Sequence, residues 1–300
     1  MSNNLSIATF FEDISPLHRA YIGYVSRYEG NTRALYEYHL NNWFRWCERQ
    51  GLEPLLVERL HIELFVRWRS EVVGNKPSTI GSIMAPIRGF YEFAVIDGII
   101  PVSPATHVRQ PRIHYTKKSP LSRQELGLLL VVARETSPRH WALMNLLGVM
   151  ALRISEALSI TRASCAEREQ GYPVLKFMGK GSKPAVMPIP NPVMRALEAA
   201  AEASPSEFLI PTRSGAQLTR SGGAGLVDTV VRRAKLDKPV NPHLLRASVI
   251  TQAFDAGLPG RDVQHLARHE DPRTTGIYDL GLNNHDRHAV HTLAARLSGG

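Results

Sequence analysis

The sequence predicts a mainly helical protein that carries one small antiparallel sheet and divides into two domains. Apolar and aromatic residues recur at helical spacing through most of its 300 residues. Residues 101–120 break that pattern with four prolines and several basic residues, which is typical of a linker. Two short apolar runs flank a glycine-rich turn, which is typical of a β-hairpin. A chain of this length also exceeds what one hydrophobic core usually organises.

The first domain is predicted over residues 1–108 as four helices. Their expected ranges are 16–27, 32–50, 58–73 and 77–96. Asn31 is a plausible N-cap of the second helix and Gly51 a plausible stop. Pro86 lies inside the fourth range, so we expect it to kink that helix or to end its first half.

The linker is placed at residues 109–120 and the second domain at residues 121–300. Ser122 and Glu125 form a capping box that begins a helix ending near residue 135. Strands are expected in PVLKFM and KPAVMPI, with Lys180 in the turn between them. Further helices are expected at residues 139–150, 191–203 and 221–235.

Charge and composition narrow the classes of function. The net charge is +9, and residues 113–300 hold 24 Lys and Arg against 16 Asp and Glu, which suits a nucleic acid or an anionic membrane surface. No apolar run reaches the roughly 18 residues of a membrane span, and MSNNLS does not resemble a signal peptide. We therefore expect a cytoplasmic, nucleoid-associated protein that binds no membrane. Cys47 and Cys165, the two cysteines, fit a reducing compartment.

The stretch from Asn241 to Asp279 concentrates side chains suited to a phosphate. Asn241 followed by Pro242 is typical of a helix start, which places His243 and Arg246 on one face at a helix N-terminus. Free N–H groups and the helix dipole favour an anion there. A second such start, at residues 271–272, opens a short helix expected to carry Tyr278 into the same pocket.

Taken singly, these residues have simpler explanations. Arg153 and Glu156 could form an exposed pair three residues apart on one helical face. Lys180 could be a solvated turn residue. His265 and His269 stand four residues apart, as metal ligands can, but no cysteine or carboxylate completes a zinc site, so no metal is expected.

The order of the motifs favours a shared function over these simpler explanations. ALRISEAL, GKGSK, HLLR and ARHEDPRTTGIY follow one another between residues 151 and 278. This series resembles the tyrosine recombinase family, which includes phage integrases and Xer-type recombinases, over residues 121–280. Two departures stand out: Ala151 and Arg268 occupy positions where the family commonly has glycine.

The resemblance implies DNA strand cleavage and rejoining through a 3′-phosphotyrosyl intermediate, with no metal, ATP or other cofactor. Tyr278 would be the nucleophile and Lys180 the general acid for the departing 5′ oxygen. Glu156 would support the site. The implied catalytic set is Arg153, Lys180, His243, Arg246, His269 and Tyr278.

The resemblance also implies partners. The substrate would be double-stranded DNA at recombination sites, bound by a homotetramer and accompanied by accessory DNA-bending or directionality proteins. A C-terminal helix at Asn283–Leu297 would dock on a neighbouring protomer. Candidate DNA contacts are Lys76, Thr79, Arg88, Lys117 and Lys118.

Two other functions stay open. A type IB topoisomerase shares the chemistry but relaxes supercoils as a monomer. A DNA-binding protein of the same fold could have lost catalysis.

Overall fold

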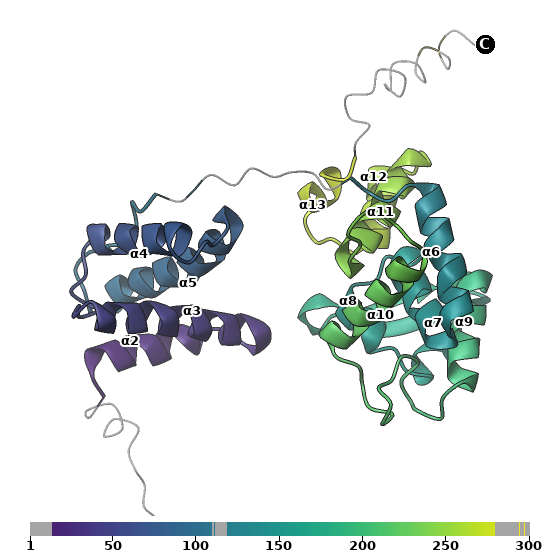
Figure 1. The fold of residues 1–300 in the computed structure, drawn as a ribbon, viewed down its shortest axis with the longest axis horizontal. Coiled ribbons are helices and arrows are strands. Elements are labelled where there is room, and N and C mark those ends of the chain that lie inside the picture. Colours follow the sequence, from purple (N-terminus) through teal and green to yellow (C-terminus); the bar gives the residue numbers. More distant parts are fainter. Residues whose placement is uncertain (1–13, 110, 112–118, 280–293, 295–296, 298–300) are drawn as a thin grey trace, which may run out of the picture. The chain divides into compact units, whose positions relative to one another are not determined.

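The computed structural model describes residues 14–109, 111, 119–279, 294 and 297. The chain divides into two compact units, Met1–Thr116 and Lys117–Gly300 (Figure 1). The family resemblance implies that the first unit is a DNA-binding, core-binding domain and that the second is the catalytic domain, and both assignments stay predictions. Within the described ranges, no helix has both the length and the apolar character needed to cross a membrane.

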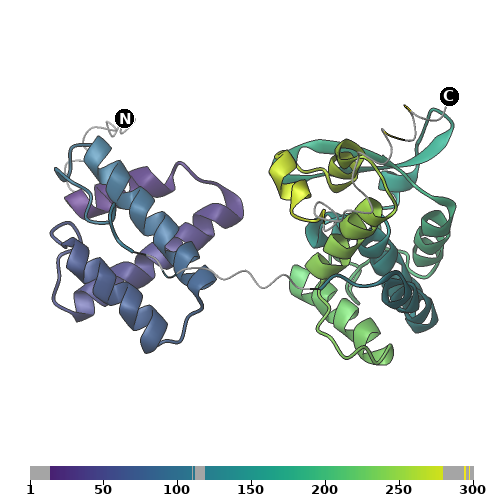
Figure 2. The ribbon, with the colours of Figure 1, turned by 90° about the horizontal axis from the view of Figure 1, so that it is seen from above.

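In the described part of the first unit, four helices pack together, as Figure 2 shows from above. They are α2 (Pro16–Val25), α3 (Gly30–Arg49), α4 (Arg59–Glu71) and α5 (Pro77–Ile96). Helix α3 begins earlier than predicted, with Glu29 rather than Asn31 at the N-cap. Gly51 follows its end in a left-handed conformation (φ 66°), as expected of a helix stop.

Aromatic side chains fill the core of the first unit. Trp43, Phe65 and Tyr91 are almost fully buried. The indole of Trp43 donates a hydrogen bond to the Tyr91 hydroxyl over 2.9 Å, which satisfies its one polar group. Helix α5 continues through Pro86, so the alternative that this proline ends the first half of the helix is wrong. The Pro86 ring is buried, and its packing offsets the backbone hydrogen bond that a proline cannot make.

The second unit is also mainly helical. Its helices are α6 (Arg123–Thr136), α7 (Pro138–Gly148), α8 (Ile154–Leu158), α9 (Asn191–Glu202), α10 (Arg220–Arg233), α11 (Pro242–Asp255), α12 (Gly260–Ala267) and α13 (Pro272–Gly276), with short 3-10 turns η1 (Ala163–Cys165) and η2 (Lys180–Ser182). Helix α7 packs against α6, α8, α9, α10 and α11, and its residues from 142 to 148 are all buried. The predicted capping box of Ser122 and Glu125 is confirmed at the start of α6.

A three-stranded antiparallel sheet completes the second unit. The strands are β1 (Arg168–Glu169), β2 (Tyr172–Met178) and β3 (Pro184–Pro188), in the order β1-β2-β3. In the β2–β3 pair, Val174 lies opposite Pro188 and Met178 opposite Pro184, as the hairpin prediction requires. The two-residue strand β1 was not predicted, because two exposed charged residues carry no apolar alternation.

Candidate active site

Arg153 and Glu156 belong to the start of α8. The two side chains pair as their spacing predicts, but Arg153 is the N-cap rather than a helical residue and Glu156 is buried, so the alternative of an exposed pair on one helical face is wrong. The Arg153 backbone N–H donates to Oε2 of Glu156 and its Nη1 donates to Oε1, each over 2.8 Å. This reciprocal cap fixes the Arg153 side chain, which stays 29% exposed.

Glu156 is a buried carboxylate held between two arginines. Its side chain is 3% exposed, and Nη2 of Arg268 lies 2.6 Å from its Oε2. Burial by itself raises the pKa of Glu156, but the Arg153 N–H and the two guanidinium groups outweigh burial and hold the pKa below its ordinary value. Glu156 is therefore ionised at neutral pH.

Arg246 projects from the first turns of α11 and is 4% exposed. Asn241 caps this helix by accepting a hydrogen bond from the Leu244 N–H over 2.8 Å, as predicted. The Arg246 guanidinium donates to the carbonyl oxygens of Ala151 and Ala267. Burial, followed by the charge of the other arginines, lowers its pKa to about 10, so it stays a cation at neutral pH.

The two carbonyl groups that Arg246 binds mark two left-handed turns. Ala151 has φ 52° and Arg268, which directly follows Ala267, has φ 50°. These are the two positions at which the sequence departs from the glycine common in the resembled motifs. Glycine adopts this conformation without the steric cost that a side chain brings, so both turns carry a backbone penalty here.

His269 follows the left-handed turn that ends α12. Its Nδ1 lies 3.0 Å from the hydroxyl of Thr275, a buried residue of α13. Burial first, and then the charges of neighbouring arginines and of His243, lower the pKa of His269 to about 4. The ring is therefore neutral at pH 7. A neutral ring that accepts the Thr275 proton at Nδ1 must carry its own proton on Nε2.

Tyr278 lies two residues beyond the end of α13, so the prediction that this helix carries it is wrong. Asp271 caps α13 as expected, by accepting a hydrogen bond from the Arg273 N–H. The Tyr278 ring stacks on His269 with 6.2 Å between ring centroids and 22° between planes. It also packs against the small cluster built on Ile250 and Phe254. Tyr278 is half-buried, which leaves part of its ring accessible.

A cavity of about 1200 Å³ lies beside this cluster, and neither Arg246 nor Tyr278 is among the residues that line it. Arg153 and His269 line it, together with residues of β3 and of the Gly179–Lys183 turn. Lys183 in that turn forms an ion pair with Glu270, the residue after His269.

The backbone of Lys180 lies in the same turn, but its side chain falls outside what the structure describes. His243 is exposed on the first turn of α11, near enough for its charge to affect His269.

Residues 120–284, more than half of the chain, match the model of the phage integrase family. The chain belongs to this family. Tyrosine recombinase XerD of Corynebacterium glutamicum is 29% identical to it, over 83% of this chain and 86% of that protein. A lambda integrase dimer bound to a COC′ core site superposes with a TM-score of 0.70 at 15% identity, covering 90% of this chain and 77% of that one. A lambda integrase tetramer bound to a Holliday junction gives a TM-score of 0.70 at 15% identity, covering 88% and 76%. The structural likeness shows the shared fold.

The family's motifs thus converge from three segments of this chain. The loop before α8 contributes Arg153, the start of α11 contributes Arg246, and the end of the described chain contributes His269 and Tyr278. Two residues of the site carry contacts that their spacing did not predict. Thr275 contacts Nδ1 of His269, and Arg268 reaches Glu156 across 112 positions of sequence.

The candidate DNA contacts lie in and beside the first unit. Lys76 is the N-cap of α5 and Thr79 is exposed on its first turn. Arg88 is half-buried and donates to the Val108 carbonyl over 2.6 Å, so it braces the segment that follows α5. Lys117 and Lys118 lie outside the described residues, as does most of Asn283–Leu297. Their roles stay predictions.

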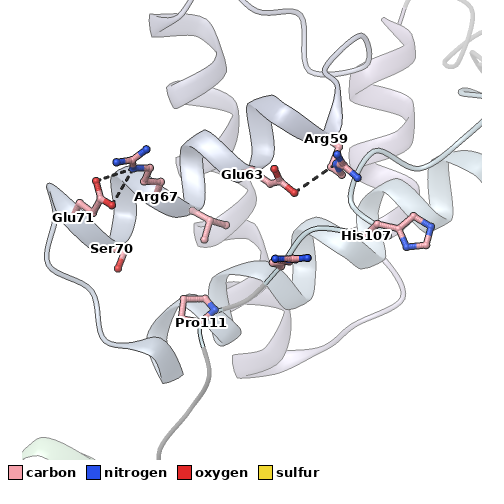
Figure 3. A pocket seen from close by; sticks show the side chains of 9 residues that line it. Arg59, Glu63, Arg67, Ser70, Glu71, His107 and Pro111 are labelled. Atoms are coloured by element: carbon pink, nitrogen blue, oxygen red, sulfur yellow. Dashed lines mark hydrogen bonds and ion pairs between the residues drawn. The ribbon is translucent and has the colours of Figure 1, made fainter.

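A second cavity, of about 620 Å³, lies within the first unit, between α4 and the segment that follows α5 (Figure 3). Two of its arginines pair along α4, Arg59 with Glu63 at 3.5 Å and Arg67 with Glu71 at 2.9 Å. The catalytic candidates do not line it. In the parts of the chain that the structure describes, no group of three His, Cys, Asp or Glu side chains is arranged to hold a metal ion.

Proposed function

We propose that this member of the phage integrase family is a site-specific DNA recombinase that cleaves and rejoins strands through a covalent 3′-phosphotyrosyl intermediate. The observation that carries the proposal is the clustering of Arg153, Arg246, His269 and Tyr278, which affect one another electrostatically or stack, beside a cavity that Arg153 and His269 line. A phosphodiester resists attack because it is negatively charged and its alkoxide leaves poorly. The site therefore needs cations, a nucleophile and an acid.

The arginines supply the cations. Arg153 and Arg246 bind the two non-bridging oxygens of the scissile phosphate and stabilise the charge that grows on them in the transition state. Both are anchored before DNA arrives, Arg153 by Glu156 and Arg246 by two backbone carbonyls. Anchoring reduces the reorganisation that the reaction requires.

His269 adds a hydrogen bond to the same phosphate. Nδ1 contacts the Thr275 hydroxyl, and when the neutral ring accepts that hydroxyl's proton its Nε2–H is the donor to the phosphate. The stacking of Tyr278 on this ring keeps the nucleophile beside the phosphate that the ring binds.

Cleavage then proceeds by exchange of two bonds at phosphorus. The Tyr278 oxygen bonds to phosphorus and its proton passes to His243, while the bond to the 5′ oxygen breaks and Lys180 gives that oxygen a proton. The ester retains the energy of the phosphodiester, so a 5′ hydroxyl from another strand rejoins by the reverse steps. Neither ATP nor a metal is required for this sequence.

The proposed complex contains several protomers and two DNA sites. The substrate is double-stranded DNA at paired recombination sites, and the first unit binds the duplex that the second unit cleaves. Four protomers bring two sites together, with Asn283–Leu297 docking on a neighbour and accessory proteins bending the DNA. The protein acts in the cytoplasm, at the nucleoid. The tetrameric lambda integrase on a Holliday junction, whose fold this chain shares over 88% of its length, supports this arrangement.

A nicked suicide substrate tests the proposal. Cleavage releases a short 5′-hydroxyl fragment and prevents rejoining, so the covalent complex accumulates. We expect a complex that forms with a chelator present and without ATP, and mass spectrometry should place the DNA 3′ end on Tyr278. A requirement for metal, or attachment at another residue, would contradict the mechanism. Relaxation of supercoils without exchange between two sites would instead favour a topoisomerase.

A further inference from the structure

We propose that Arg268 is a positioning residue for the cleavage reaction: acting through Glu156, it fixes Arg153 and keeps that guanidinium free to bind phosphate. This inference rests on the proposed function. Arg268 stands where the resembled motif commonly has glycine, so its side chain is a feature of this chain.

The backbone at Arg268 does not favour a side chain. The residue is the C-cap of α12 with φ 50° and ψ 48°, a conformation that glycine adopts at lower cost. The contacts of the guanidinium group offset that cost. It lies 5.0 Å from the centre of the Phe177 ring and donates to the Leu266 carbonyl over 3.3 Å.

Those contacts join three parts of the site. Phe177 belongs to β2, and Met187, whose sulfur lies 2.6 Å from Nη1 of Arg268, belongs to β3. These strands flank the turn that contains Lys180. The other arm of the guanidinium binds Glu156 at the start of α8. Arg268 therefore links the hairpin to the Arg153 cap, and His269 is the next residue in the chain.

The charge of Arg268 is a second reason to expect that it supports phosphate binding by Arg153. Arg153 and Glu156 alone form a neutral pair, in which the carboxylate competes with a phosphate for the guanidinium. Arg268 binds the same carboxylate, so the group of two guanidinium ions and one carboxylate has a net charge of +1. The Glu156 charge is shared, and Arg153 retains attraction for the phosphate.

The test compares Arg268→Gly with Lys235→Gly by single-turnover cleavage of the suicide substrate. Lys235 is also left-handed (φ 51°) and exposed beyond α10, so its replacement removes one positive charge and one strained side chain away from the site. We expect Lys235→Gly to cleave at the wild-type rate. Arg268→Gly should cleave roughly 10- to 100-fold more slowly, since misplacing a catalytic group by about 1 Å can cost about 100-fold.

Two further variants separate positioning from simple loss of stability. Arg268→Lys keeps the charge but not the planar fork, so it should recover part of the rate. In a Glu156→Gln background, Arg268→Gly should cause little further loss, because the path through the carboxylate is already broken. Wild-type cleavage by Arg268→Gly, or losses that add in the double variant, would overturn the inference. If the wild-type protein itself forms no adduct, the proposed function has failed instead.

Discussion

Ala151 and Arg268 both adopt a left-handed backbone conformation that glycine adopts more easily, and they stand at the two turns that Arg246 contacts. Arg246 binds the Ala151 carbonyl on one side and the carbonyl before Arg268 on the other. The turns therefore stay fixed although neither has the glycine that would form it most easily. The family resemblance marked both positions as unusual, but it did not reveal that Arg268 reaches Glu156, because sequence spacing carries no information on contacts 112 residues apart.

The neutral state of His269 gives a prediction on pH. Burial and the charges of Arg246, Arg153, Arg268 and His243 lower its pKa from the ordinary 6.5 to about 4. The unfolded chain therefore binds more protons than the folded one between these values. The stability that the neutral ring contributes is complete above pH 6.5 and is lost as the pH falls toward 4.

NMR titration of the free protein checks this prediction directly. The His269 ring resonances should titrate near pH 4, and the fall in stability between pH 6.5 and 4 should be smaller in His269→Asn. A Thr275→Val variant should keep the fold but lose the fixed Nε2–H tautomer and slow cleavage. Titration of His269 near pH 6.5 would contradict the account.

At the scale of elements, the β2–β3 hairpin carries the two candidates for the proposed acid, Lys180 and Lys183. Lys183 forms an ion pair with Glu270, and Lys180 lies three residues earlier in the same turn. Lys180→Ala should cleave an ordinary phosphodiester about 10²- to 10⁴-fold more slowly, as for other general acids. It should recover much of this loss on a 5′-bridging phosphorothiolate, because sulfur leaves without protonation.

Two matched variants complete that experiment. Arg153→Ala should not recover on the sulfur substrate, since its charge acts on the non-bridging oxygens. Lys183→Ala should cleave the ordinary substrate at close to the wild-type rate. Recovery by Lys183→Ala and not by Lys180→Ala would show that Lys183 is the acid and that the assignment to Lys180 is wrong.

The elements that local chemistry determines were predictable from the sequence. Asn241 and Asp271 cap their helices as expected, because a side-chain oxygen that accepts a backbone N–H is a local interaction. The errors lie at element ends. Arg153 is a cap held by Glu156 rather than a helical residue, and Tyr278 lies beyond α13, because a sequence pattern locates an element better than it locates the element's ends.

For the whole molecule, the net charge of +9 predicts how DNA binding depends on salt. Neutralising phosphates releases counterions, so the logarithm of the binding constant should fall linearly with that of salt concentration, by about 0.9 per phosphate contacted. A Lys117→Ala, Lys118→Ala double variant should reduce this slope by about 2 if both lysines contact phosphates. A binding constant insensitive to salt would contradict the proposed DNA contacts.

The central claim is that Tyr278 attacks the scissile phosphate, while the arginines and His269 bind that phosphate without help from the Tyr278 hydroxyl. Tyr278→Phe removes one hydroxyl and leaves the arginines and His269 in place, so it should bind the recombination site with an unchanged Kd. Tyr172→Phe, at a tyrosine 66% exposed on β2, is the matched control. On a suicide substrate, wild type and Tyr172→Phe should form the covalent complex and Tyr278→Phe should form none; a covalent complex with Tyr278→Phe would contradict the account.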